Sequence, residues 1–159
     1  MQRPLRFVLL ALLALSATAL AACGGADERE AKNAYVRGVN AAQNEFASNV
    51  STVSGEITAT SSSDEDRRTL ERFETAIQDV VRKLRAIEVP DDVQTEHEQL
   101  TAAMGGFGDD IKEATTALRN PTTRAIAEAQ RTIAMATQTV NGRIDSAIAA
   151  INSKLGSEQ

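Results

Sequence analysis

Apolar residues recur at intervals of three and four along most of the chain beyond residue 27. This spacing places them on one face of an α-helix, and the alternating β-branched and aromatic runs typical of strands are absent. The pattern predicts an all-α fold with helices within residues 27–57, 62–89, 90–118 and 120–155. The stripe positions of the four segments are, in order, Tyr35, Val39, Ala42, Phe46, Val50, Val53 and Ile57; Leu70, Phe73, Ile77, Val80, Val81, Leu84 and Ile87; Val93, His97, Leu100, Met104, Phe107, Ile111, Ala114 and Leu118; and Ile126, Ala129, Ile133, Ala136, Val140, Ile144, Ile148, Ile151 and Leu155.

The expected helix boundaries rest on capping and proline signals. Ser62 and Glu65 have the spacing of a capping box, which predicts the start of the second helix. Pro90 lacks an amide hydrogen and restricts the residue before it, so the second helix ends there and the third begins. Asn120 followed by Pro121 predicts an N-cap and a first helical position for the fourth helix.

Short connections between long helices favour antiparallel neighbours, and each apolar stripe can be covered only by the other helices. We therefore expect an antiparallel up-down four-helix bundle. Its topology places the start of the first helix, the Pro90 turn and the C-terminus at one end. A three-helix arrangement with the first helix detached is the alternative, because the first stripe contains alanines and has Gly38 nearby.

The N-terminal segment has the features of an export signal. Arg3 and Arg6 form a short positive region with no acid, and residues 7–20 are almost wholly apolar. About 14 residues make roughly 21 Å of helix, which is shorter than the roughly 30 Å hydrocarbon core of a bilayer. The segment is therefore expected to be cleaved rather than to remain as a membrane span.

The sequence Leu20-Ala21-Ala22-Cys23-Gly24 resembles the bacterial lipobox. That resemblance implies cleavage before Cys23 and attachment of acyl chains, such as palmitate, to this cysteine. The expected organisation is a signal peptide at 1–22, a lipid-anchored tether at 23–26 and a helical domain at 27–159 on the extracytoplasmic side of the cell membrane. An ordinary secretory cleavage site, with Cys23 as an unpaired thiol, is the alternative.

Charge and cysteine content narrow the function classes. Removal of 22 of the 159 residues leaves 137, enough for one domain, with 15 basic and 22 acidic residues and a net charge of −7. Such a balance argues against a nucleic-acid partner, because phosphates require a basic face. No cysteine follows Cys23, so the domain cannot form an internal disulfide and must be stabilised by packing.

His97 is the only histidine, and it lies between Glu96 and Glu98 on the third stripe. Di-metal helical bundles use Glu-x-x-His pairs on two helices, but position 94 is Gln and no second histidine exists. That site is excluded, and we expect no metal and no other cofactor. A packed, hydrogen-bonded histidine is the favoured interpretation, and a pH-sensitive role is the second hypothesis.

Gly105, Gly106 and Gly108 surround Phe107 within the third segment. Each glycine costs about 1 kcal/mol relative to alanine inside a helix, so the cluster is a local weakness. A phosphate-binding loop would need a preceding strand and further signature residues, which are absent. The hypothesis is a hinge or a site where another backbone or a ligand approaches closely.

Three basic residues, Arg82, Lys83 and Arg85, end the second predicted helix. Cations at a helix C-terminus commonly complement its dipole, and contact with anionic lipid headgroups is the alternative. Nucleophilic catalysis lacks its parts, because there is no serine elbow motif and no second histidine. We therefore expect a protein that is not an enzyme.

The stretch 84–90, followed by His97 and Leu100, resembles a pattern in small uncharacterised helical lipoproteins, notably actinobacterial ones. The resemblance implies an extracytoplasmic helical domain and brings no known active site. The expected function is a protein-interaction or scaffold module of the cell envelope, bound to the membrane through Cys23 and to an envelope protein partner. The alternative is a small-ligand carrier or sensor that opens between helices near the glycine cluster.

Overall fold

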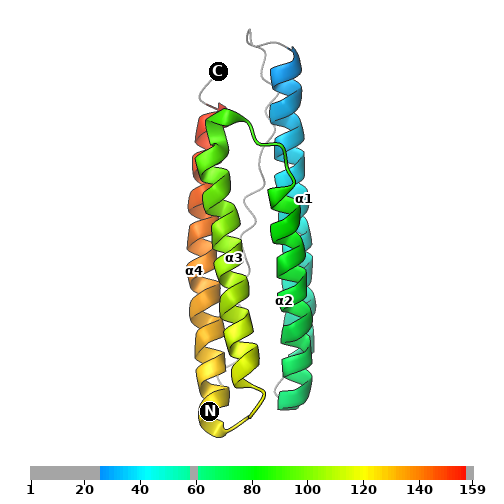
Figure 1. The fold of residues 1–159 in the computed structure, drawn as a ribbon, viewed down its shortest axis with the longest axis vertical. Helices are drawn as coiled ribbons and strands as arrows, with labels where there is room; N and C mark the ends of the chain where they lie inside the picture. The colour runs from blue at the N-terminus through cyan, green and yellow to red at the C-terminus, as the bar shows by residue number, and fades with distance from the viewer. Residues whose placement is uncertain (1–25, 58–60, 157–159) are drawn as a thin grey trace.

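The computed structural model describes residues 26–57 and 61–156, so the predicted signal peptide and Cys23 lie outside the described residues. The described part is helical and contains no strand (Figure 1). Its elements are α1 (Ala26–Glu56), α2 (Ser63–Arg85), the short 3₁₀ helix η1 (Asp91–Val93), α3 (Gln94–Ala117) and α4 (Thr123–Gly156).

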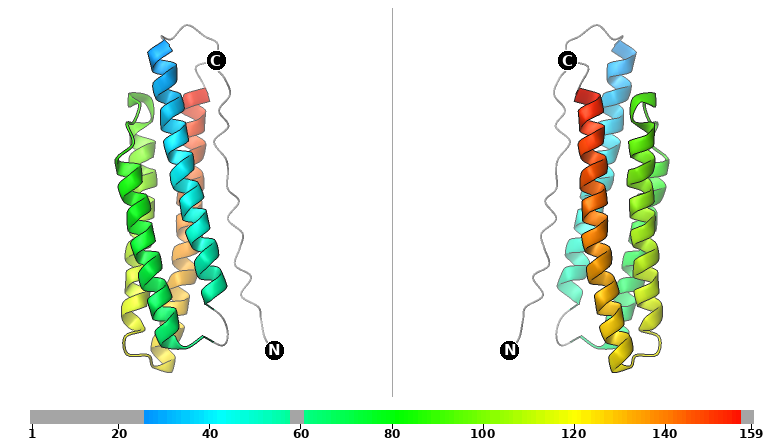
Figure 2. Two further views of the ribbon diagram at one scale, coloured as in Figure 1. Left: turned by 90° about the vertical axis from the view of Figure 1, so that its right-hand side faces the viewer. Right: turned by 90° about the vertical axis from the view of Figure 1, so that its left-hand side faces the viewer.

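The four long helices form an antiparallel up-down bundle, as the sequence predicted (Figures 1 and 2). Helix α1 packs on α2, α2 on α3 and α3 on α4, whereas close approach between α1 and α4 is much sparser. The start of α1, the turn with Pro90 and the end of α4 lie together at the upper end in Figure 1, which we call the Pro90 end. Because α1 is packed on α2, the arrangement with a detached first helix is wrong.

One continuous apolar core receives side chains from all four long helices. All eight stripe positions of the third predicted segment, from Val93 to Leu118, are buried. Near the middle of the bundle the rings of Phe46, Phe73 and Phe107 pack together, with centroids 5.9 to 6.3 Å apart. Aromatic contacts of this kind contribute about 0.5–1.5 kcal/mol beyond the area that they bury.

The apolar stripes are less well covered at the end opposite Pro90, which we call the far end. There Val50, Val53 and Ile57 of the first stripe and Ile126 and Ile133 of the fourth are only half-buried against the core. Four of these side chains belong to α1 or α4, and Ile57 directly follows α1.

The capping box at the start of α2 is confirmed. The Ser62 backbone amide donates to Glu65 Oε2 at 2.8 Å, and the Glu65 amide donates to Ser62 Oγ at 3.3 Å. These two bonds satisfy donors that have no partner within the helix. At the other end α2 stops at Arg85, and Pro90 precedes η1, so the predicted boundary near Pro90 is also confirmed.

The predicted start of the fourth helix is wrong by a few residues. The sequence placed the N-cap at Asn120 and the first helical position at Pro121, but α4 begins at Thr123. Thr122 performs the capping, because its hydroxyl accepts a hydrogen bond from the Ala125 amide at 3.1 Å. A threonine three residues before that amide has the geometry of an N-cap, so Pro121 lies just outside the helix.

Candidate functional site

Polar and charged side chains from three of the long helices and η1 meet at the Pro90 end of a core that is mostly apolar. Four of them, Lys32, Tyr35, Glu96 and His97, are buried. We define the Pro90-end cluster as Lys32 and Tyr35 of α1, Asp92 of η1, Glu96 and His97 of α3, and Lys154 of α4.

His97 forms hydrogen bonds through both ring nitrogens. Its Nε2 lies 3.0 Å from the Leu84 carbonyl oxygen, and its Nδ1 lies 3.3 Å from the Tyr35 hydroxyl. A carbonyl oxygen can only accept, so Nε2 carries the proton and Nδ1 of the neutral ring accepts from Tyr35. The two rings meet edge to face, with centroids 5.6 Å apart.

The Leu84 carbonyl is one of the last carbonyls of α2, which have no partner further along the helix. It accepts from the Ile87 amide at 3.1 Å as well as from His97. The imidazole of α3 therefore donates a hydrogen bond to a carbonyl at the C-terminal end of α2. The phenol of α1 donates to the other ring nitrogen. This arrangement joins three helices through one side chain.

Burial determines the protonation states of this pair. It lowers the pKa of His97, although the hydrogen bond to the Leu84 carbonyl and the charge of Glu98 oppose that shift. Burial, with a smaller contribution from the Glu96 charge, raises the pKa of Tyr35 well above its ordinary value. At neutral pH the imidazole is therefore neutral and the phenol keeps its proton, which is the combination that the two hydrogen bonds require.

Three ion pairs lie at the Pro90 end. Lys154 Nζ lies 2.9 Å from Glu96 Oε2, which joins α4 to α3 and lowers the pKa of Glu96. Lys32 Nζ lies 3.3 Å from Asp92 Oδ2 and 3.1 Å from Glu28 Oε1, which joins α1 to η1. The Pro90-end cluster thus connects all the elements that meet at this end.

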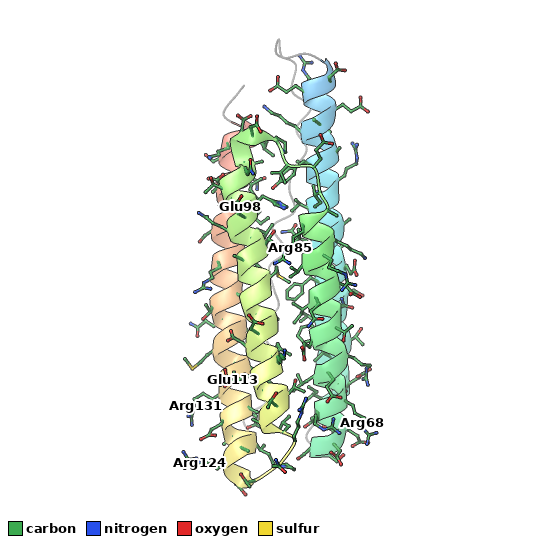
Figure 3. The ribbon with its side chains drawn as sticks, viewed as in Figure 1. Arg68, Arg85, Glu98, Glu113, Arg124 and Arg131 are labelled. Atoms are coloured by element: carbon green, nitrogen blue, oxygen red, sulfur yellow. The ribbon has the colours of Figure 1, made fainter. Side chains whose placement is uncertain are left out.

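Two of the three basic residues at the end of α2 are engaged within the bundle. Arg82 pairs with Asp79 one turn earlier, and Lys83 pairs with Glu45 of α1. Arg85 is exposed where α2 ends (Figure 3). The ion pairs favour a structural role for Arg82 and Lys83 over contact with lipid headgroups.

The glycine cluster lies in uninterrupted helix, and no described glycine has a positive φ. A Cβ placed on Gly108 would lie 3.2 Å from Ile77 Cγ2 of α2, closer than ordinary van der Waals contact. A Cβ on Gly105 or Gly106 would meet nothing within 4 Å. Close approach is therefore observed at Gly108 alone among the three, and the hinge hypothesis stays a prediction.

Sequence reasoning identified His97 but missed most of its neighbours. Lys32 could have been found, because it precedes Tyr35 and Val39 at helical spacing on the same stripe. Glu96 could have been found in the same way, because it lies four residues before Leu100 and seven before Ala103 at helical spacing. In the structure it faces α4. Nothing in the sequence pairs Tyr35 with His97, because the contact spans 62 residues of chain.

Comparison with protein-family models, with curated proteins and with solved structures gave no match. Within residues 26–57 and 61–156, no helix is long and apolar enough to cross a membrane. Among those same residues, no group of three histidine, cysteine or acidic side chains is placed to hold a metal ion. The chemistry that the described site offers is hydrogen bonding and proton uptake at His97.

Replacing Tyr35 by Phe should destabilise the protein by about 1–2 kcal/mol, because Nδ1 of His97 is then buried without a donor. Urea unfolding at pH 7.5 measures the effect. In a His97→Leu background the same replacement should cost much less, since no acceptor remains to be left unsatisfied. Equal costs in the two backgrounds would contradict the assigned hydrogen bond.

Replacing Gly105 or Gly106 by Ala should stabilise the protein by about 0.5–1 kcal/mol each, because the helix gains propensity and the methyl meets no atom. Gly108→Ala should gain less or destabilise, since its methyl would press against Ile77. Thermal unfolding of the three single variants tests this ranking. Equal stabilisation at all three positions would show that α2 and α3 do not approach closely at Gly108.

Proposed function

We propose that this protein is a lipid-anchored component of the cell envelope whose helical bundle serves as an interaction or scaffold module for another envelope protein. The observation that carries the proposal is the spacing between the lipobox-like sequence and the bundle. Cys23 is the only cysteine, and α1 begins at Ala26, three positions later. An acylated Cys23 would hold the bundle close to the membrane surface, since two or more acyl chains give stable attachment where one does not.

Orientation follows from this short tether. The Pro90 end contains the start of α1, so it would be the end nearest to the lipid. Helix α4 has 34 residues, which corresponds to about 50 Å of helix. The far end of the bundle would then stand about that distance above the membrane and present its half-buried apolar side chains there.

Packing supports a scaffold over a small-ligand carrier. At the level of the glycine cluster, Phe107 packs against Phe46 and Phe73 in the core, so the space between α1, α2 and α3 is filled by rings. Gly105 and Gly106 have no atom beside them, but both positions are half-exposed, so the space there opens to the surface of the helix. Among the described residues Met135 is the exposed large apolar side chain, so a partner would contact mainly polar helix faces.

The test is to produce the native chain and a Cys23→Ser variant in a bacterium, separate the membrane and soluble fractions, and measure the intact mass. The native protein should be in the membrane fraction, start at Cys23 and carry acyl mass. Cys23→Ser should lose both acylation and membrane attachment. Ser16→Ala, within the signal segment but outside residues 20–24, is the matched control and should behave as the native chain.

Crosslinking in cells then separates the two function classes. A scaffold should yield a defined envelope protein that crosslinks to the native chain and is lost with Cys23→Ser. A carrier should instead co-purify with an organic ligand that mass spectrometry detects. A native protein with a free thiol, or with cleavage at another position, would overturn the anchored model.

A further inference from the structure

The side chain of His97 in α3 contacts two other helices, α1 at a sequence separation of 62 residues and the end of α2 at a separation of 13. It is 6% exposed, and its two nitrogens contact the Tyr35 hydroxyl of α1 and the last-turn carbonyl of Leu84 in α2. Both contacts suit a neutral ring with its proton on Nε2. A second proton would have to be placed on Nδ1, which faces the hydroxyl.

We propose that His97 is an acid-sensitive latch: when its ring takes up a second proton, the junction of α1, the end of α2 and the start of α3 loosens at the Pro90 end. The proposal rests on the two hydrogen bonds of the buried ring and on the charges around it. It goes beyond the proposed function, because it concerns how the bundle responds to the medium and not what it binds.

The hydrogen-bond geometry explains why the charged ring is poorly accommodated. Once Nδ1 carries a proton, the Tyr35 hydroxyl can only accept from it, and the hydroxyl's own proton then needs another acceptor. Among the described residues, His97 is the partner that this hydroxyl contacts. Protonation therefore leaves either two facing donors or a buried hydroxyl proton without an acceptor, and each costs free energy.

The charges near the ring do not remove this penalty. Of the carboxylates, Asp92 is paired with Lys32 and Glu96 with Lys154, so each is balanced by a cation of the same cluster. The charge of Glu98 favours the protonated ring, but Glu98 is exposed, so solvent weakens this interaction. The charged groups of the surrounding segments are Asp27, Glu28, Arg29, Glu30, Lys32 and Arg37 of α1; Arg82, Lys83 and Arg85 of α2; Glu88 between α2 and η1; Asp91 and Asp92 of η1; Glu96 and Glu98 of α3; and Lys154 of α4.

The direction of the pH response follows from burial. Because burial lowers the pKa of His97 in the closed junction, an opened junction binds the proton more readily. The stabilisation of the closed form is complete above the ordinary histidine pKa of about 6.5 and is lost as the pH falls below it. Each pH unit in that window changes the closed-to-open ratio by up to about tenfold.

If the bundle is outside the cytoplasm, as the proposed function holds, the latch would be exposed to the pH of the medium. The Pro90 end is also the end nearest to Cys23 in that model. The latch itself needs only His97 and its partners, so a failure of the lipid-anchor test would leave it standing. A failure of the latch would likewise leave the anchored scaffold intact.

Hydrogen–deuterium exchange of the full chain tests the proposal. Peptides from residues 26–36 and 86–97 report on the junction, and peptides from 123–135 at the far end are the internal reference. After correction for the intrinsic effect of pH on exchange, junction protection should fall by up to about tenfold between pH 6.5 and 5.5. Protection in 123–135 should change much less.

Two variants assign the effect to His97. His97→Gln keeps a donor for the Leu84 carbonyl and an acceptor for Tyr35 without titrating, so its junction should show no step in this window. Glu98→Gln changes an exposed side chain and should fold normally. Because it lowers the pKa of the closed ring, it should extend the step to lower pH by on the order of a few tenths of a pH unit and leave its onset in place.

Three results would overturn the latch. They are a native junction whose protection is unchanged from pH 7.5 to 5.5, a step of equal size in His97→Gln, and a step in the native chain whose lower pH limit Glu98→Gln leaves unchanged. The first and third apply even if His97→Gln fails to fold. The second would assign the acid response to a carboxylate such as Glu96.

Discussion

The hydrogen bond between His97 and the Leu84 carbonyl sets the level at which α3 lies against α2. The two helices are antiparallel, so seven residues back from Leu84 corresponds to seven residues forward from His97. This brings Ile77 level with Met104, and a further seven residues brings Leu70 level with Ile111. All four of these side chains are buried. One directional polar contact at the Pro90 end therefore agrees with the register of the whole apolar interface between α2 and α3. Helix α4 in turn packs on α3, so its position depends on the same register.

Such a polar contact helps to select one helix register in a bundle whose interfaces are mainly aliphatic. Aliphatic side chains at heptad spacing can pack in registers that differ by one heptad with only a modest loss of apolar burial. The described residues contain no cysteine, so no disulfide selects among these registers. A buried histidine that finds both a carbonyl and a hydroxyl in one register, and loses them in the others, discriminates by the cost of unsatisfied polar groups. The close fit of Gly108 against Ile77 adds a steric contribution to the same choice.

Sequence reasoning could predict the parts of the fold that depend on local signals. Helical spacing predicted the four stripes, Ser62 with Glu65 predicted the capping box, and Pro90 predicted the main boundary, because each depends on residues within one or two turns. The start of α4 was misplaced because Asn120 and Thr122 are both competent caps and the sequence does not decide between them. The Pro90-end cluster was missed for a different reason. Its members come from α1, η1, α3 and α4, so which charges pair depends on how the helices dock.

The central claim is that His97 is a neutral imidazole with its proton on Nε2, held between Leu84 and Tyr35. The most direct measurement is the nitrogen NMR spectrum of the His97 ring in the uniformly labelled protein, followed from pH 8 to pH 5. The account predicts a protonated Nε2 and an unprotonated Nδ1 at pH 7.5, with a titration midpoint below the ordinary value of about 6.5. A proton on Nδ1 at pH 7.5, or a midpoint at or above 6.5, would contradict it.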